Sequence, residues 1–325
     1  MLKYSANAPP ALRNLFHRYE DMKVKPSYTI DVLCVGAGTY DLVYSVDRHP
    51  EPDEKIRATS FIGCGGGPAA NGAVAAAHFG LRAAFVGYLG HDIFGNAHFQ
   101  ELQQAGVRTD HIARGEYSSA LSVVIVKPDG SRALVNYRNP ESYLASGSFD
   151  FSSIDAKVIL FDGHEPRISP DLARAARQRN IVTVLDAGSI HSGTEELASL
   201  VDYLVCSEKF GLGFSGEKNE DRAVEKLSSY APNVIITIGD RGLVWKNQEG
   251  SGRLEPFKVT SVDTTGAGDV FHGVLAACLA QGKKWSDSLR YASAAGALCC
   301  TKTGARLGIP TKLEIEEFLE SRQKE

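Results

Sequence analysis

The chain has 325 residues, of which 43% are hydrophobic and 23% charged, and 35 basic against 39 acidic side chains give a formal net charge of −4. This composition is typical of a globular protein with a substantial core. It argues against nucleic acid or an anionic membrane as a partner, because both select basic surfaces. We find no uninterrupted apolar run of about 18 residues and no signal-peptide pattern, so neither a membrane span nor export is expected and the cytoplasm is the default location. Six cysteines without a C-x-x-C pair indicate buried free thiols.

The first 27 residues precede the first clear strand and carry no recognisable chemistry. They contain three prolines, and only residues 13–22 could form a short helix. We therefore expect an N-terminal extension over 1–27 and one larger domain over 28–325.

A strand of buried type is expected at 30–35, followed by Gly36-Ala-Gly38. Two glycines in this place suggest a dinucleotide-binding turn, but Asp41 stands where the third glycine should be. A nicotinamide oxidoreductase is therefore a minor alternative. A loop carrying Asp41 at the carboxyl end of a parallel strand is a natural ligand position, although the side chain could also only cap the loop.

A glycine run at 63–67 opens an alanine-rich helix that carries Asn71 near its start. Glycines let a backbone approach a ligand closely, and small helix residues allow close packing on a sheet. Residues 44–62 interrupt the strand and helix rhythm and are interpreted as β structure outside the main sheet. Residues 120–126 and 133–137, separated by a Pro-Asp-Gly turn, predict a hairpin. Asn136 near its end either reaches a ligand or is structural.

Strands and helices then alternate, which predicts a mostly parallel sheet covered on both faces and hence an α/β fold of three layers. The expected strands lie at 83–87, 158–162, 181–185, 200–206 and 234–238, and expected helices at 95–105, 170–179, 286–300 and 313–319. Asp162-Gly-His164 and Asp186-Ala-Gly188 follow strands and so point towards a ligand crevice. His164 could line that crevice or be hydrogen-bonded structure.

The segment Asp263-Thr-Thr-Gly-Ala-Gly-Asp269 leads into an apolar stripe at helical spacing, so a buried helix is expected to begin near Gly268. Residues 257–262 before it alternate like a strand. In such a turn, the backbone N–H groups of Gly266, Ala267 and Gly268 would form an anion hole, which the helix dipole reinforces. The carboxylate of Asp269 beside that hole suits phosphoryl transfer to a hydroxyl, although it could also only favour the helix dipole.

Two of these motifs resemble the signatures of one enzyme family, the ribokinase-like carbohydrate kinases of the phosphofructokinase B type. Asp-Thr-Thr-Gly-Ala-Gly-Asp269 with the following Val-Phe-His-Gly273 resembles the C-terminal signature, and Gly-Gly-Gly-Pro-Ala-Ala-Asn71 the N-terminal one. The resemblance implies an ATP- and Mg²⁺-dependent kinase with a three-layer fold and a small β lid, formed by about 43–63 and 117–140. It also implies a homodimer through that lid.

The resemblance assigns roles residue by residue. Asp269 would be the base for direct in-line transfer to a primary hydroxyl, and 266–268 would hold the phosphate. The sugar contacts would be Asp41, Gly66, Gly67, Asn71, Asn136 and His164. The nucleotide contacts would be Ser207, Thr237, Gly239, Gly242 and Gly304, with Asp263 and Thr265 beside a monovalent cation such as K⁺.

Within the family, the motifs look closest to ketohexokinase-like and sulfofructose-kinase-like members. Pro68 stands where ribokinase usually has lysine, which argues against a pentose, and His164 stands where an arginine would hold a sulfonate. A ketohexose or a related sugar is therefore expected. Ser207 and Phe210 replace the outer residues of the family's Asn-x-x-Glu magnesium motif. A nucleoside kinase of the same fold and a catalytically silent nucleotide-binding protein remain as alternatives.

Overall fold

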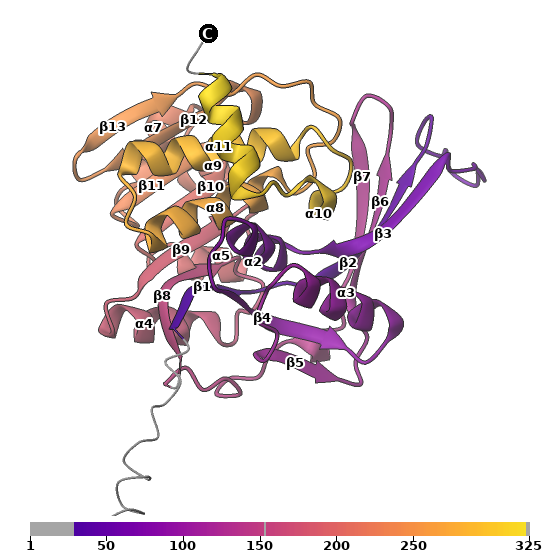
Figure 1. Cartoon of the computed structure of the whole chain (residues 1–325), viewed down its shortest axis with the longest axis horizontal. Coiled ribbons are helices and arrows are strands. Elements are labelled where there is room, and N and C mark those ends of the chain that lie inside the picture. Colours follow the sequence, from indigo (N-terminus) through magenta and orange to yellow (C-terminus); the bar gives the residue numbers. More distant parts are fainter. Residues whose placement is uncertain (1–28, 153, 323–325) are drawn as a thin grey trace, which may run out of the picture.

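The computed structural model describes residues 29–152 and 154–322, so the predicted extension over 1–27, with its candidate helix, lies outside the described residues. Within the described part, one sheet has nine strands and a second sheet has four (Figure 1). The large sheet contains β1 (Thr29–Val35), β4 (Ala83–Gly90), β5 (Ile112–Gly115), β8 (Asp155–Phe161), β9 (Val182–Ala187), β10 (Tyr203–Ser207), β11 (Asn233–Thr237), β12 (Leu243–Asn247) and β13 (Gly250–Leu254). The small sheet contains β2 (Thr39–Ser45), β3 (Ser60–Gly66), β6 (Ala120–Val126) and β7 (Arg132–Tyr137).

Helices cover both faces of the large sheet. They are α2 (Pro68–His78), α3 (Ile93–Gln104), α4 (Ser169–Gln178), α5 (Ser192–Leu197), α6 (Glu208–Ser215), α7 (Glu220–Leu227), α8 (Ala267–Ala280), α9 (Trp285–Cys299), α10 (Ala305–Gly308) and α11 (Lys312–Ser321), with short 3₁₀ turns at Pro140–Ser142 and Gly239–Arg241. No helix in the described ranges is long and apolar enough to cross a lipid bilayer.

The large sheet has the order β13-β12-β11-β10-β9-β8-β1-β4-β5, and its pairs are parallel except those of β12 with β11 and β13. Alternate residues of β1 enter two separate cores. Val32 and Cys34 join the core under α2, α8 and α9, whereas Leu33 and Val35 join the core under α4 and α7. This division is what a sheet buried on both faces requires, and it confirms the predicted three-layer α/β/α fold.

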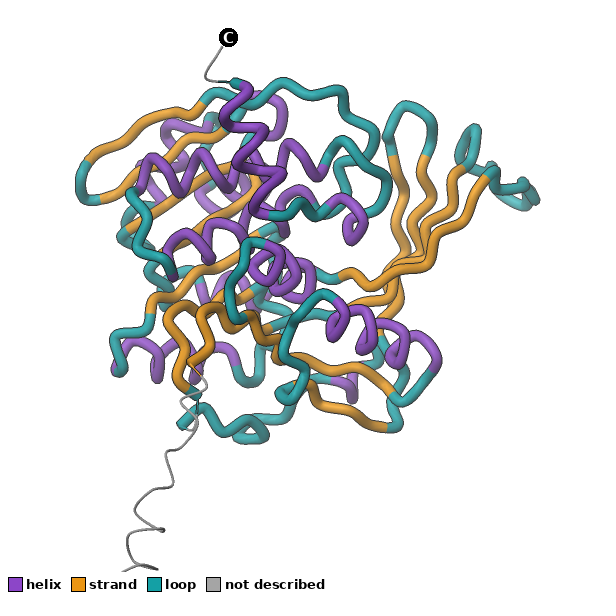
Figure 2. The backbone as a smooth tube through the Cα atoms, viewed as in Figure 1, coloured by secondary structure: helices purple, strands orange, loops and turns teal. Residues whose placement is uncertain are grey.

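The four-stranded sheet projects from one side of the body, and loops join its strands at the far end (Figure 2). The predicted hairpin forms as β6 and β7. The expectation for 44–62 was too broad, because β2 ends at Ser45 and β3 begins at Ser60, with a loop between them. Two prolines at 50 and 52 account for the break, since proline cannot donate to a strand ladder.

The strand predicted at 257–262 is absent, and the chain after β13 runs without helix or strand to the start of α8. Its amides bond elsewhere: Val262 N and Asp263 N donate to the carbonyl of Cys300. Phe257 packs instead on Phe318 of α11, with ring centroids 5.5 Å apart. The alternating side chains of this segment pack against helices, and its backbone is not paired with any strand in the described part of the chain.

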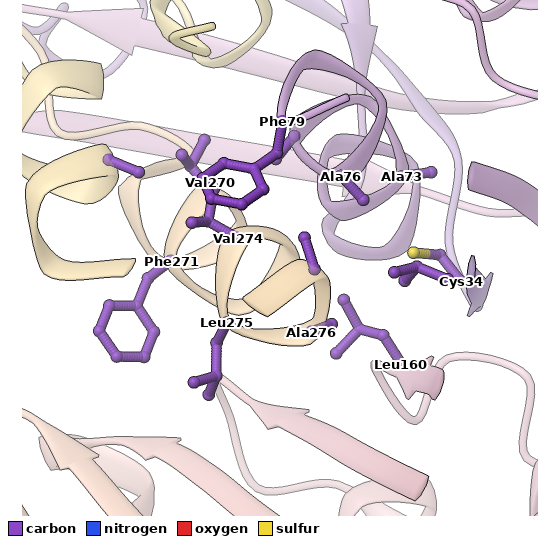
Figure 3. Close-up of a cluster of buried hydrophobic side chains, with 14 of the residues drawn as sticks. Cys34, Ala73, Ala76, Phe79, Leu160, Val270, Phe271, Val274, Leu275 and Ala276 are labelled. Carbon is purple, nitrogen blue, oxygen red and sulfur yellow. The ribbon is translucent and has the colours of Figure 1, made fainter. Parts of the chain in front are cut away.

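Close packing of α2 on α8 brings the starts of the two helices together. Figure 3 shows Ala73 and Ala76 of α2, and Phe79 just after it, near Val270 and Val274 of α8, all within one buried cluster. Alanine and valine at these positions keep the helix surfaces close, and every one of them is at most 1% exposed. The first turns of α2 and α8, which carry the two sequence motifs, therefore lie beside each other.

A buried carboxylate at the start of the sheet gives a prediction about acid stability. Asp31 accepts from Arg82 Nε at 2.9 Å and from Lys157 Nζ at 2.8 Å. The Arg82 side chain is the main cause that lowers the pKa of Asp31 below its ordinary value. Because the folded-state pKa is the lower one, these contacts stabilise the fold above the ordinary pKa near 4 and are lost as pH falls further.

We expect Asp31→Asn to lower the urea midpoint at pH 7, with a difference from wild type that shrinks as the pH is lowered through 4 to 2. Urea unfolding at several pH values checks this. A difference that stays constant from pH 7 to pH 2 would show that the charge of Asp31 is not the cause.

Candidate active site

The first turn of α8 meets the first turns of α2 through one side-chain hydrogen bond. Asn71 Nδ2 donates to Asp269 Oδ2 at 2.8 Å, although the two residues are 198 positions apart. Asn71 is 2% exposed, and its Oδ1 is buried without a hydrogen-bond partner among the described residues. Asp269 as a whole residue is partly buried. The structure thus places Asp269, the predicted base, beside Asn71, a predicted sugar contact. The Oδ1 atom of Asn71 can still accept a hydrogen bond.

The turn before α8 is held by a single carboxylate. Asp263 Oδ1 accepts from Thr265 N at 2.9 Å and from Thr265 Oγ1 at 2.7 Å, and Asp263 Oδ2 accepts from Gly304 N at 2.8 Å. Gly266 caps the helix with φ +78°, and a Cβ there would lie 2.5 Å from the Cβ of Ala305. Both the positive φ and the close contact with Ala305 require glycine at this position. Asp263 therefore ties the predicted anion turn to the loop of Gly304.

Several carboxyl groups gather around this turn. The pKa of Asp269 is raised to about 7, mainly because the carboxyl group is buried and secondly because the charge of Asp186 is near. Burial and Asp162 likewise raise the pKa of Asp186 to about 8. Burial also raises the pKa of Asp41, which is 7% exposed. A carboxyl group with a pKa near neutrality is suited to take a proton and release it again.

Asp41 lies in β2 and not in the loop that was expected to carry it. Thr39 Oγ1 donates to Asp41 Oδ1 at 2.9 Å, and Gly66 of β3 faces the same carboxylate. Asp41 pairs with Ser122, which pairs with Asn136, so the three side chains share one face of the small sheet. Ser122 Oγ donates to Asn136 Oδ1 at 2.8 Å, which leaves the amide NH₂ of Asn136 available.

Gly67 is the N-cap of α2 and links the end of β3 to the helix that carries Asn71. The first turn of α2 is held by Asp162, to which the sequence assigned no role. Asp162 Oδ2 accepts from Ala37 N at 2.8 Å and from Ala69 N at 3.0 Å, and its Oδ1 accepts from His164 N at 2.8 Å. Asp162 thus joins the loop after β1, the start of α2 and its own strand end.

The space for this carboxylate comes from Gly36, because a Cβ there would lie 1.8 Å from Asp162 Oδ1. The first glycine of the incomplete dinucleotide motif therefore makes room for Asp162. Only the position of Asp162 at a strand end signalled its importance.

His164 stacks on His191, with ring centroids 4.6 Å apart, at the same edge of the sheet. Its carbonyl accepts from Arg138 Nη1 at 2.7 Å, and Arg138 also forms a salt bridge with the fully buried Glu165. Arg138 is therefore a structural link between the end of the hairpin and the segment after β8. No hydrogen bond connects the His164 ring with Asp41 or Asp269 in the described part of the chain.

The predicted nucleotide contacts lie at neighbouring strand ends. Ser207 and Thr237 are paired across β10 and β11, and Gly239 begins the turn that Gly242 closes. Ser207 Oγ accepts from Phe210 N at 3.1 Å and donates to Gly188 O at 2.9 Å, so it caps α6. Glu208, which follows Ser207 in the substituted magnesium motif, forms a salt bridge with Arg241 at 2.6 Å.

Comparison with known proteins decides the family. Residues 29–312 match the model of the family described as pfkB family carbohydrate kinase. The chain belongs to this family of carbohydrate kinases. Membership confirms the predicted resemblance and the predicted activity, an ATP-dependent sugar kinase.

Individual relatives cover nearly the whole chain. Ribokinase of Bacillus subtilis is 29% identical over 89% of this chain and 99% of its own length. A probable fructokinase-4 of Arabidopsis thaliana is 30% identical over 81% of this chain and 89% of its own. The solved structure of Arabidopsis thaliana ribokinase complexed with ribose and ATP has 25% identity and a TM-score of 0.79, and covers 90% of this chain and 99% of that one.

Proposed function

We propose that this pfkB-family kinase transfers the γ-phosphoryl group of ATP directly to a primary hydroxyl of a small sugar, a ketohexose or a close relative, with Asp269 as the base. One observation carries the proposal: a carboxylate with a pKa raised to about 7, on a partly buried residue, stands in the first turn of α8, next to the glycine turn and bonded to Asn71. An anion hole beside a base is what direct phosphoryl transfer needs.

In the proposed reaction, Asp269 takes the proton of the acceptor hydroxyl while the oxygen attacks the γ-phosphorus of ATP. The new P–O bond forms as the bond to the β-phosphate oxygen breaks, and ADP leaves with that electron pair. Amides at 266–268 face the charge on the transferring group. Asp263 holds both the turn and the Gly304 loop, which supports donors positioned before ATP arrives, and the weak 3.4 Å bond from Ala267 N to Thr264 O would have to open for that amide to take part.

The sugar would lie between α2 and the small sheet. Asn71 Oδ1 is buried and unpaired, and a buried acceptor without a donor is costly, so a sugar hydroxyl is a fitting partner. Asp41, with Gly66 and Gly67 beside it, would accept further hydroxyls. Asn136 shares the face of Asp41 and would close over the sugar. His164 would contribute at the strand end.

The nucleotide would lie along the strand ends at Ser207, Thr237, Gly239 and Gly242, with Gly304 near its phosphates. Mg²⁺ entering with ATP would keep its contacts to phosphate oxygens and water, as this ion prefers. Glu208 Oε1 accepts from Arg241 Nη2 at 2.6 Å, so this carboxylate is already engaged in a salt bridge. A monovalent cation such as K⁺ would use carbonyl oxygens near Asp263 and Thr265.

The domain would span 28–325, with the small sheet, about 43–63 and 117–140, serving as its lid. Arg132 at the start of β7 supports this proposal, because its Nη1 donates to Thr264 Oγ1 at 2.8 Å. The hairpin thus already contacts the turn that would hold the phosphate. A lid excludes water, which would otherwise accept the phosphoryl group.

The outer face of the small sheet supports a homodimer. Phe61, Val135 and Tyr137 are 55%, 67% and 55% exposed, and the strand register places all three on the face opposite Asp41. A second copy of the chain could cover this apolar face. We expect Val135→Glu to convert a dimer into a monomer, and Val135→Thr to leave the dimer intact, in sedimentation velocity at micromolar concentration. A wild-type protein that stays monomeric throughout would contradict the homodimer.

A coupled assay of ADP release tests the function itself. Purified full-length protein with ATP and Mg²⁺ is offered ketohexoses, pentoses, aldonates and nucleosides. We expect turnover with a ketohexose to exceed turnover with ribose, and a phosphate ester of the sugar to be recovered. Selective turnover of a pentose or a nucleoside would correct the substrate class, and no ADP release with any acceptor would favour a silent nucleotide-binding protein.

A further inference from the structure

The imidazole of His272 lies in α8, one helical turn beyond Asp269, and has no role in the reaction described above. It is 3% exposed. Nδ1 lies 2.5 Å from the carbonyl oxygen of Gly268 and 3.2 Å from Asp186 Oδ2, and Nε2 lies 3.2 Å from the carbonyl oxygen of Val205. Asp186 and Val205 are paired across β9 and β10, so this ring connects α8 with two neighbouring strands.

The partners of both ring nitrogens are hydrogen-bond acceptors. Carbonyl oxygens cannot donate, and a neutral imidazole carries a single N–H, so in a neutral ring one nitrogen lone pair would face an oxygen lone pair. A protonated Asp186 would not remove this conflict, because Gly268 O is the nearer partner of Nδ1. Both nitrogens are satisfied only when both carry protons. Pairing with a cationic ring opposes the burial that raises the pKa of Asp186, itself 6% exposed, so an ionised Asp186 is the counter-ion of that ring.

The charges around Asp269 make a cation at this place consequential. Asp186 and Asp41 raise the pKa of Asp269, with burial as the larger cause, whereas His272 lowers it. Arg306 of α10 also acts on Asp269, and the Cys299 thiol of α9 is a further titratable neighbour. Opposite charges three positions apart on a helix, as at Asp269 and His272, stabilise each other.

Other neighbouring groups also change the pKa values of His272 and Asp186. The pKa of His272 is lowered overall, because burial outweighs the carbonyls of Gly268 and Val205 and the charge of Asp269, which raise it. Burial and Asp162 raise the pKa of Asp186, and the Cys206 thiol is its neighbour on β10. The acceptor geometry of the ring is the observation that decides between these opposing effects.

We propose that His272 is a positioning residue for the proposed base: paired with Asp186, it is held as an imidazolium that keeps Asp269 ionised and fixes the Gly268 carbonyl. This inference rests on the proposed role of Asp269. In addition, the protein itself supplies a cation next to the base, the imidazolium of His272. The ring does not touch the sugar or ATP in this account.

His272→Asn tests the charge separately from the hydrogen bond, because an asparagine amide can still donate to Gly268 O from the place of Nδ1. We expect the acid limb of the pH profile of kcat/KM to move up by about one pH unit. Activity below the limb would then fall about tenfold and return towards wild type at pH 9. A purely structural role would reduce activity by the same factor at every pH. His272→Gln, which can donate near Val205 O instead, provides a second variant should the first fail to fold.

Imidazole ¹⁵N spectra of the wild-type protein at pH 7.5 give a readout that needs no turnover. Both ring nitrogens of His272, assigned by loss of their signals in His272→Asn, should show the shifts of a protonated imidazolium. His78→Asn, whose ring also faces a carbonyl but lies far from the base, should leave the pH profile unchanged. A neutral ring, or an unmoved acid limb in His272→Asn while Asp269→Asn is inactive, would overturn this inference alone. Turnover by Asp269→Asn would instead overturn the proposed function.

Discussion

Replacing Asp269 by asparagine should reduce turnover by about 10²- to 10⁴-fold, the range that a positioned general base contributes. Asparagine has the size of aspartate and can keep a hydrogen bond to Asn71, so the first turn of α8 should keep its shape. What it loses is the ability to take the proton of the acceptor hydroxyl. The measurement is kcat with saturating ATP and the best sugar from the panel, together with ATP binding by titration calorimetry.

ATP binding should change little in Asp269→Asn, because the contacts proposed at 266–268 are main-chain amides that the substitution keeps, and the other proposed nucleotide contacts lie on other elements. Asp171→Asn is a matched control, because this carboxylate is in α4 and its side chain is 79% exposed. Turnover by Asp269→Asn within a factor of three of wild type would remove Asp269 from the role of base. Loss of ATP binding together with turnover would instead indicate a damaged fold.

In wild type, the raised pKa of Asp269 gives a related expectation for pH. A base with a pKa of about 7 is ionised above that pH and protonated below it. The value of kcat/KM should therefore fall as pH drops through about 7, well above the range in which an ordinary aspartate titrates. An acid limb near pH 4 would show that the carboxylate is not desolvated in the active enzyme.

Removing the carboxylate of Asp162 should have the largest effect on stability. In Asp162→Ala, the amides of Ala37, Ala69 and His164 all lose their acceptor, and the first two bonds are buried. A buried donor without a partner costs about 1–3 kcal/mol, so we expect a loss of about 3–5 kcal/mol in the free energy of unfolding. Urea unfolding followed by circular dichroism measures it.

Asp162→Asn should be milder, because its side-chain oxygen can still accept some of these bonds. Both variants should also raise KM for the sugar more than KM for ATP, since Asp162 holds the segment that leads to Asn71. A loss below about 1 kcal/mol in Asp162→Ala would mean that water or rearrangement replaces these bonds.

The sequence alone was sufficient to predict the layered fold, and the family resemblance assigned both motifs to one site. Strand-end residues share one edge of a parallel sheet, and this topology brings Asn71 to Asp269 across 198 positions. Main-chain partners were harder to foresee. Nothing in the side-chain pattern reveals that Asp162 binds amides 125 and 93 residues away. The error at 257–262 has a similar origin, because alternation cannot tell a paired strand from a segment packed on helices.

His272 illustrates the same limit within the site. Its place one turn beyond Asp269 could be read from the sequence, but its three acceptors come from α8, β9 and β10 and become visible only in the fold. Single-residue patterns describe what a side chain offers. The protonation state of a buried ring depends on what surrounds it.

The most direct test of the account is a crystal structure of the full-length protein with ADP, aluminium fluoride, Mg²⁺ and the sugar that gives the fastest ADP release. We predict that a primary hydroxyl of the sugar lies within hydrogen-bond distance of an Asp269 carboxylate oxygen, with the fluoride facing the amides of 266–268. A sugar whose nearest hydroxyl lies out of reach of Asp269, or a fluoride bound away from that turn, would contradict the account.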